Sequence, residues 1–171
     1  TKRPIRDEKL QLPSGLGEPR SMQFSIIPML EKNNATPIST LIILQDITEE
    51  KKAKDAMYRL ASIISSSEDA ITSENEDGII MSWNPAAEQL YGYKAEEIAG
   101  RPISMLVPQD RIGELHDIFN KIKKGERIKH FSTRRRRKDG TDINISLTIS
   151  PVKDMDGNII GTSTIAHEIP R

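Results

Sequence analysis

Residues 76–93 read EDGIIMSWNPAAEQLYGY, and this stretch contains a turn, a short apolar strand and a capped helix. Asp77-Gly78 favours a tight turn because glycine tolerates positive φ, and the apolar run 79–83 that follows has the length of a strand. Asn84 can accept a backbone N–H at the start of the next helix, and Pro85 suits the first helical position. The stretch predicts a hairpin that leads directly into a helix. We assign Asn84 to structural capping, a role in which aspartate would serve equally well.

The composition is that of a globular protein of about one domain. The chain has 171 residues, 36% of them hydrophobic and 29% charged, and its 25 basic and 25 acidic residues balance. A membrane span needs about 20 consecutive apolar residues, and the sequence contains no such run. Cysteine is absent, which removes disulfides, thiolate metal ligands and cysteine nucleophiles. We expect a cytoplasmic protein whose segment here makes no membrane contact.

Apolar periodicity predicts the elements that follow the hairpin. A helix is expected over 110–124, where apolar residues recur at helical spacing. Strands are expected at 70–74, 127–136, 142–152 and 158–168. Together with the run 79–83 these strands predict an α+β fold, a five-stranded antiparallel sheet with the helices inserted between the second and third strands.

A hairpin near the start of the chain is repeated near its end. A shift of 123 residues aligns Met22, Phe24, Ile26 and Pro28 with Ile145, Leu147, Ile149 and Pro151, and a shift of 122 aligns Asp46-Ile47 with Glu168-Ile169. Tandem copies of one unit produce such repetition, although two hairpins can also look alike by chance. We therefore interpret 1–48 as a loop and the last two strands of a preceding copy, 49–66 as a helical linker and 67–171 as a complete domain.

Six short motifs occur in an order that resembles the PAS family of sensory domains. They are WNPAAE at 83–88, GY at 92–93, IAG at 98–100, RKDGT at 137–141, SP at 150–151 and DG at 156–157. The similarity extends from about Met57 to Ile169. It implies a sheet whose concave face and long helix enclose a small-molecule pocket. The cysteine-dependent flavin and coumarate photochemistry of the family is not available to this chain, which has no cysteine.

Candidate pocket residues follow from alternation on the strands and from spacing on the long helix. By this criterion the core or pocket lining includes Ile80, Ile112, Phe119, Phe131, Leu147 and Ile149. His116 is added because haem-binding oxygen sensors of the resembled family ligate iron from a histidine on the matching helix. The spacing around His116 differs from theirs, and Phe131 stands where they carry an arginine. We therefore expect no cofactor and no metal, with a haem-based gas sensor kept as an alternative.

The linker helix is expected to carry the signal. Asp46-Ile47-Thr48 resembles the exit of a PAS domain into a helix, and the helix over 49–64 has no interior glycine or proline. Its apolar residues at 4-3-4 spacing indicate either one seam of a coiled coil or a stripe packed on its own domain; they are Ala53, Met57, Leu60 and Ile64. If the stripe is a coiled-coil seam, the protein is expected to form a homodimer.

The resemblance implies a sensory module, and the lack of catalytic motifs predicts that the module is not an enzyme. Glycine-rich phosphate loops and nucleophile motifs are absent from the sequence. The basic run 134–138 alternates between two faces of a strand, so we expect no nucleic-acid binding. The module would bind a small ligand or a partner and pass the signal to an effector domain of the parent chain, which the resemblance suggests is a histidine kinase of a two-component system. A ligand-free protein-interaction and dimerisation module is the alternative.

Overall fold

The computed structural model describes residues 6–12, 19–30 and 37–170. The chain divides near residue 60 into two compact units. In the described ranges no helix has both the length and the apolar character needed to cross a bilayer.

The first unit contains a three-stranded antiparallel sheet in the order β1-β2-β3. These strands are β1 (Arg6–Leu12), β2 (Arg20–Leu30) and β3 (Pro37–Asp46). The sequence indicates mostly loop before the two expected strands, with a short strand near 8–12, and the structure forms the longer strand β1 there. Its sequence, RDEKLQL, is largely charged and polar, which suits an edge strand.

The pairing in this sheet repeats the pairing at the end of the second unit. Met22 lies opposite Asp46 in β2 and β3, and Ile145 lies opposite Glu168 in the strands β7 and β8. The shifts of 123 and 122 residues also relate the pair Phe24–Leu44 to the pair Leu147–Ala166. The pairing of β1 with β2 has the same register as the pairing of β6 with β7. The repeat that the sequence indicates is therefore present in the hydrogen-bonded register as well.

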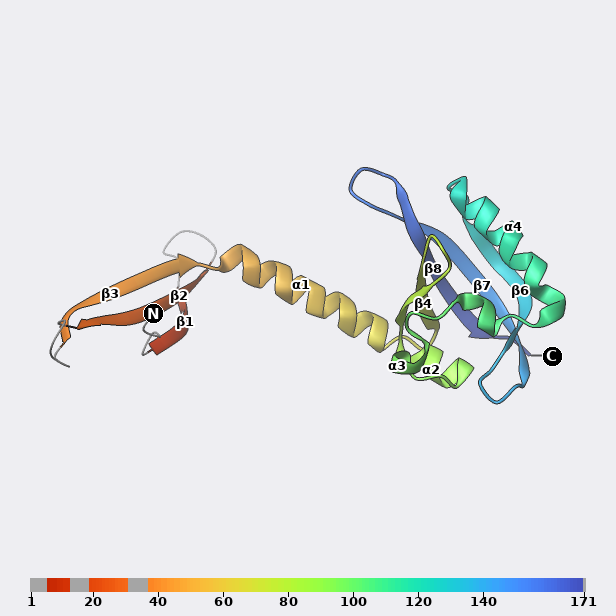
Figure 1. Cartoon of the computed structure of the whole chain (residues 1–171), viewed down its shortest axis with the longest axis horizontal. Coiled ribbons are helices and arrows are strands. Elements are labelled where there is room, and N and C mark those ends of the chain that lie inside the picture. The colour runs from red at the N-terminus through yellow and green to blue at the C-terminus, as the bar shows by residue number, and fades with distance from the viewer. Residues whose placement is uncertain (1–5, 13–18, 31–36, 171) are drawn as a thin grey trace. The chain divides into compact units, whose positions relative to one another are not determined.

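The second unit is an α+β domain, which confirms the predicted fold class (Figure 1). Its sheet is antiparallel in the order β5-β4-β8-β7-β6. The strands are β4 (Ala70–Asn75), β5 (Ile80–Trp83), β6 (Ile128–Arg136), β7 (Asp142–Lys153) and β8 (Ile159–Glu168). The helices inserted between β5 and β6 are α2 (Pro85–Tyr91), α3 (Ala95–Ile98), the 3₁₀ turns Ile103–Leu106 and Gln109–Arg111, and α4 (Ile112–Lys123).

One face of this sheet carries the hydrophobic core. Alternate residues of β7 from Ile143 to Ile149 are buried, as the period of a strand requires. They pack with Ile118 and Ile122 of α4 and with Ala87 and Tyr91 of α2. The helices therefore cover the inner face, and α4 contacts β7.

Helix α1 (Thr48–Ser65) occupies the predicted linker and has no buried residue in the described structure. Its apolar side chains are largely in solvent: Met57 is 73% exposed, Leu60 62% and Ile64 44%. An exposed apolar stripe of this kind is unusual for a helix packed on its own domain.

Candidate ligand cavity

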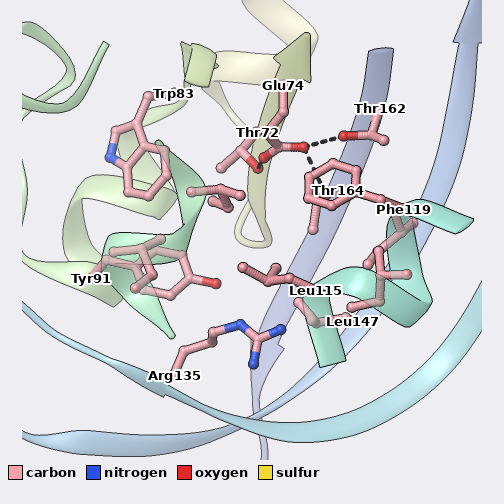
Figure 2. A pocket seen from close by; sticks show the side chains of 14 residues that line it. Thr72, Glu74, Trp83, Tyr91, Leu115, Phe119, Arg135, Leu147, Thr162 and Thr164 are labelled. Carbon is pink, nitrogen blue, oxygen red and sulfur yellow. Dashed lines mark hydrogen bonds between the residues drawn. The ribbon is translucent and has the colours of Figure 1, made fainter. Parts of the chain in front are cut away.

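A cavity of about 40 Å³ lies between the inner face of the sheet and α4 (Figure 2). By volume it has room for about three water molecules. Its apolar wall consists of Leu115, Ile118 and Phe119 from α4 and of Leu147 and Ile149 from β7. Strand alternation and the helical repeat together turn these five side chains to one space, because every second strand residue and every third or fourth helix residue share a face.

Glu74 forms a buried acidic group on the wall of the cavity. It is the inward residue at the end of β4 and is 5% exposed. The hydroxyls of Thr72, at 2.7 Å, and of Thr164, at 3.2 Å, donate to its carboxylate, and Thr162 donates to it as well. Burial raises the pKa of Glu74 above its usual value, although these hydrogen bonds oppose the rise. Glu74 is thus a carboxyl group that the fold biases toward its neutral form.

Tyr91 places a hydroxyl inside the cavity. Its ring is buried and packs against Trp83 with a centroid separation of 5.2 Å, which fixes the direction of the hydroxyl (Figure 2). Burial raises the pKa of Tyr91 far above its ordinary value, so the group is a neutral hydrogen-bond donor at all physiological pH values.

Arg135 supplies a buried guanidinium from β6. The residue is 4% exposed, and its Nη1 donates to Glu114 Oε2 at 3.2 Å, to Thr133 Oγ1 at 3.1 Å and to the carbonyl of Arg134 at 2.8 Å. Glu114 also binds Arg111 at 3.0 Å. Partial burial raises the pKa of Glu114, but the hydrogen bonds from Thr133 and the two arginines outweigh this and hold it below the usual range. The Arg135 charge is therefore compensated on one side only.

The predicted pocket residues divide into three groups in the structure. Phe119, Leu147 and Ile149 line the cavity. Ile80 is fully buried in the core, and Phe131 is partly buried and packs against that core. Neither residue lines the cavity.

Two candidates on α4, Ile112 and His116, are exposed to solvent and do not line the cavity. One residue of helix corresponds to about 100° of rotation, so Leu115 takes the inward position instead of His116. His116 is thus not placed to ligate a haem in this cavity. In the part of the chain that the structure describes, no group of three acidic or histidine side chains could hold a metal ion.

Sequence reasoning missed the polar residues of the cavity, although a signal for them existed. Phe131, Thr133 and Arg135 alternate along one strand, so a strand with Phe131 directed inward also directs Arg135 inward. The same parity joins Thr72 and Glu74 in β4. From the sequence alone, charged residues such as Glu74 and Arg135 indicate a solvent-exposed strand end, because the elements that cover them are not visible in the local pattern.

The other members of the basic run are paired with acids at the surface. Arg134 binds Asp110 at 2.5 Å, and Arg136 binds Asp142 at 2.8 Å. Arg137 binds Glu168 at 2.8 Å and Lys138 binds Glu97 at 2.5 Å. The run therefore presents alternating ion pairs and no continuous basic surface.

Asn84 connects the cavity region to the end of α1. Its Oδ1 accepts the backbone N–H of Ala87 at 2.9 Å, which is the predicted helix cap, and that of Ile71 at 2.9 Å. Its Nδ2 donates to the carbonyls of Ile64 at 3.1 Å and Asp69 at 3.0 Å. Asn84 is therefore a cap and also a clamp that holds the last turn of α1.

Three of the predicted signalling residues, Asp46, Ile47 and Thr48, lie at the start of α1. Asp46 Oδ1 accepts the Thr48 N–H at 3.0 Å, and Thr48 Oγ1 in turn accepts the Ser21 N–H at 2.9 Å. Ile47 is 6% exposed and donates its N–H to the Ser21 carbonyl. Ala53 lies on the exposed surface of the helix, as do the other members of its apolar stripe.

Comparison with known proteins agrees with this architecture. Among solved structures, a PAS domain from Colwellia psychrerythraea is 26% identical and has a TM-score of 0.62, covering 67% of this chain and 98% of that one. The PAS domain of an HTR-like protein from Haloarcula marismortui is 21% identical, with a TM-score of 0.61 and coverage of 71% and 98%.

Among curated proteins, the oxygen sensor protein DosP of Escherichia coli (strain K12) is 56% identical over 36 residues, which are 21% of this chain and 4% of that protein. The family model described as the PAS fold matches residues 58–169. Because this match spans more than half of the chain and the sheet order and inserted helices agree with the solved PAS domains, the chain belongs to the PAS family.

Proposed function

We propose that this chain is a sensory module that binds a small molecule in the cavity beneath α4 and transmits the response through α1 to an effector domain of a cytoplasmic signalling protein, such as a sensor histidine kinase of a two-component system. The observation that carries this proposal is a cavity with apolar walls and a few buried polar groups, Glu74, Tyr91 and Arg135. Ligand sites commonly combine these features, because apolar contact gives affinity and fixed polar groups give selectivity.

A short route leads from the cavity to the linker helix. Trp83 and Tyr91 line the cavity, and Asn84 follows Trp83 directly and caps the helix that carries Tyr91. A ligand that shifts these rings would also shift Asn84, whose amide holds the Ile64 carbonyl at the end of α1. The helix has no interior glycine or proline, so a displacement at one end is transmitted along it.

The repeated strand register supports a tandem arrangement in which β1–β3 are the closing strands of a second PAS-like unit. The equivalent residues of the two exits are Asp46 before α1 and Glu168 at the end of β8. In this arrangement α1 is a connection between two sensory units.

Ligand binding can be tested on the full chain through its single tryptophan, since Trp83 lines the cavity. Native mass spectrometry of freshly purified protein would report a retained small molecule, and an absorption spectrum would report a haem. A small-molecule library would then be screened by thermal shift and Trp83 fluorescence. Hits that lose their effect on replacing Leu147 by phenylalanine, which narrows the cavity and keeps Trp83 the single tryptophan, would support the proposal. If no compound binds in this manner, the ligand-binding function is wrong.

A second candidate function is a ligand-free dimerisation module, and the exposed apolar stripe of α1 favours it. Met57 and Leu60 are more than half exposed. In a homodimer such residues would form the seam between two helices. Sedimentation of the full chain measures this directly, and a monomer at high concentration would contradict it.

A further inference from the structure

Arg135 retains hydrogen-bonding capacity toward the cavity. All of its hydrogen bonds to described residues come from Nη1, which leaves Nε and Nη2 without a protein partner in the described structure. Nevertheless, within that same part of the chain no fully buried side-chain nitrogen or oxygen lacks a partner. The remaining N–H groups of Arg135 are therefore accessible from the cavity that the residue lines.

Tyr91 adds a second donor at the same end of the cavity. Its hydroxyl makes no hydrogen bond to another residue that the structure describes, although the residue is 4% exposed. Figure 2 shows this hydroxyl on the side of the cavity where Arg135 lies, whereas Glu74 and its threonines lie at the opposite end. A guanidinium with two unused donor nitrogens and a phenol without an acceptor among the described residues define a site for an oxyanion.

The charge distribution favours an anion over a cation. Glu74 is biased toward its neutral form, and the hydroxyls of Thr72, Thr162 and Thr164 already occupy its oxygens. A cationic ligand would have to displace these bonds and ionise a buried acid. At the other end, the Arg135 guanidinium has donors to spare and shares its acidic partner Glu114 with Arg111.

We propose that the cavity binds a small monocarboxylate, with the carboxylate on Arg135 and Tyr91 and the alkyl tail against Leu115, Leu147 and Ile149. This inference rests on the proposed ligand-binding function and specifies its chemical class. The planar carboxylate matches the paired N–H groups of a guanidinium, which explains why an arginine suits this position.

The size of the cavity restricts the ligand further. A space of about 40 Å³ accommodates a molecule of the size of acetate or propionate. Phe119 and Thr162 line both this cavity and a second hollow beside Asn75 and Gly161, so a longer tail would meet these two side chains. Binding should therefore weaken for a branched or aromatic carboxylate.

The experiment compares three probes that are similar in size and differ in charge. Propionate, propionamide and n-propylamine are titrated into the full chain in carboxylate-free buffer at constant ionic strength, with Trp83 fluorescence and saturation-transfer NMR as readouts. We expect propionate to bind and the amine not to bind. The amide should bind about tenfold or more weakly, because hydrogen bonds between charged partners are the stronger ones.

Two variants and one control assign the binding to this site. Tyr91→Phe retains the ring and should weaken propionate binding several-fold, and Arg135→Gln should weaken it about tenfold or more. Glu114 retains Arg111 and Thr133 in the second variant, so folding should persist. Arg134→Gln removes the same charge from the solvent-facing neighbour on the strand and should leave binding unchanged.

Each outcome bears on a different statement. Three results would overturn the carboxylate assignment. They are equal binding of propionate and propionamide, binding of the amine, and unaltered propionate binding in both Tyr91→Phe and Arg135→Gln. If another compound from the library binds in the cavity while propionate does not, the carboxylate assignment is wrong and the sensory function stands. If no compound of any class binds there, both are wrong.

Discussion

Replacing Asn84 by aspartate should destabilise the second unit, although aspartate is as good a helix cap as asparagine. The Asn84 amide makes four hydrogen bonds, two through Oδ1 and two through Nδ2. Aspartate can accept the two N–H bonds but cannot donate to the carbonyls of Ile64 and Asp69, and it brings a carboxylate oxygen against them. The expectation from the sequence, that aspartate would be nearly neutral, is therefore revised.

The magnitude follows from the bonds that are lost. A net hydrogen bond contributes about 1 kcal/mol, so losing two and adding repulsion at a site that is 4% exposed should cost about 2–4 kcal/mol for Asn84→Asp. Asn84→Ala loses the cap and all other bonds and should cost about as much. Asn75→Asp is the matched control, because its Oδ1 accepts the N–H groups of Asp77 and Ile79 in the same manner and should change stability by about 0.5 kcal/mol or less.

Urea unfolding followed by the fluorescence of Trp83 measures these values in the unit that contains Asn84. If the free energy of unfolding of Asn84→Asp lies within about 0.5 kcal/mol of the wild-type value, the two bonds donated by Nδ2 do not contribute to stability. Asn84 would then act only as the helix cap. A loss for Asn75→Asp equal to that for Asn84→Asp would refute the distinction between accepting and donating roles.

Three further predictions concern other parts of the chain. Burial raises the pKa of Glu74, so the folded chain keeps this proton at pH values where the unfolded chain has released it, and stability should fall as pH rises above the ordinary value of 4.5. Thermal melts should therefore show Glu74→Gln gaining on wild type as the pH is raised above that value. Gly161→Ala would place its Cβ 2.1 Å from the Glu74 carbonyl oxygen and should lose about 2 kcal/mol or more in urea unfolding, whereas Gly113→Ala, with no neighbour within 4 Å, should not destabilise; equal effects would contradict this. Combined Met57→Glu and Leu60→Glu changes should dissociate a dimer in sedimentation without lowering the melting temperature, and a lower melting temperature with unchanged association would mean that the stripe packs on its own domain.

Local patterns determined the elements and their order. The turn at Asp77-Gly78, the capped helix after Asn84 and the alternation of β7 each specify a conformation through neighbouring residues alone, because strand and helix periods are local properties. The repeat between the first unit and the last strands was also visible, since pairing register follows the side-chain pattern. From these elements the α+β class and the inward positions of Phe119, Leu147 and Ile149 follow.

Only the tertiary structure decided what the inward residues face. Ile80 and Leu147 obey the same alternation, yet one is packed on all sides and the other borders a void, because a void depends on how closely α4 approaches the sheet. Arg135 and Tyr91 come from elements distant in sequence, and they border the same cavity only after the helices cover the sheet. The two donated bonds of Asn84 likewise require the end of α1 and the loop before β4 to be in place, a condition that no local pattern contains.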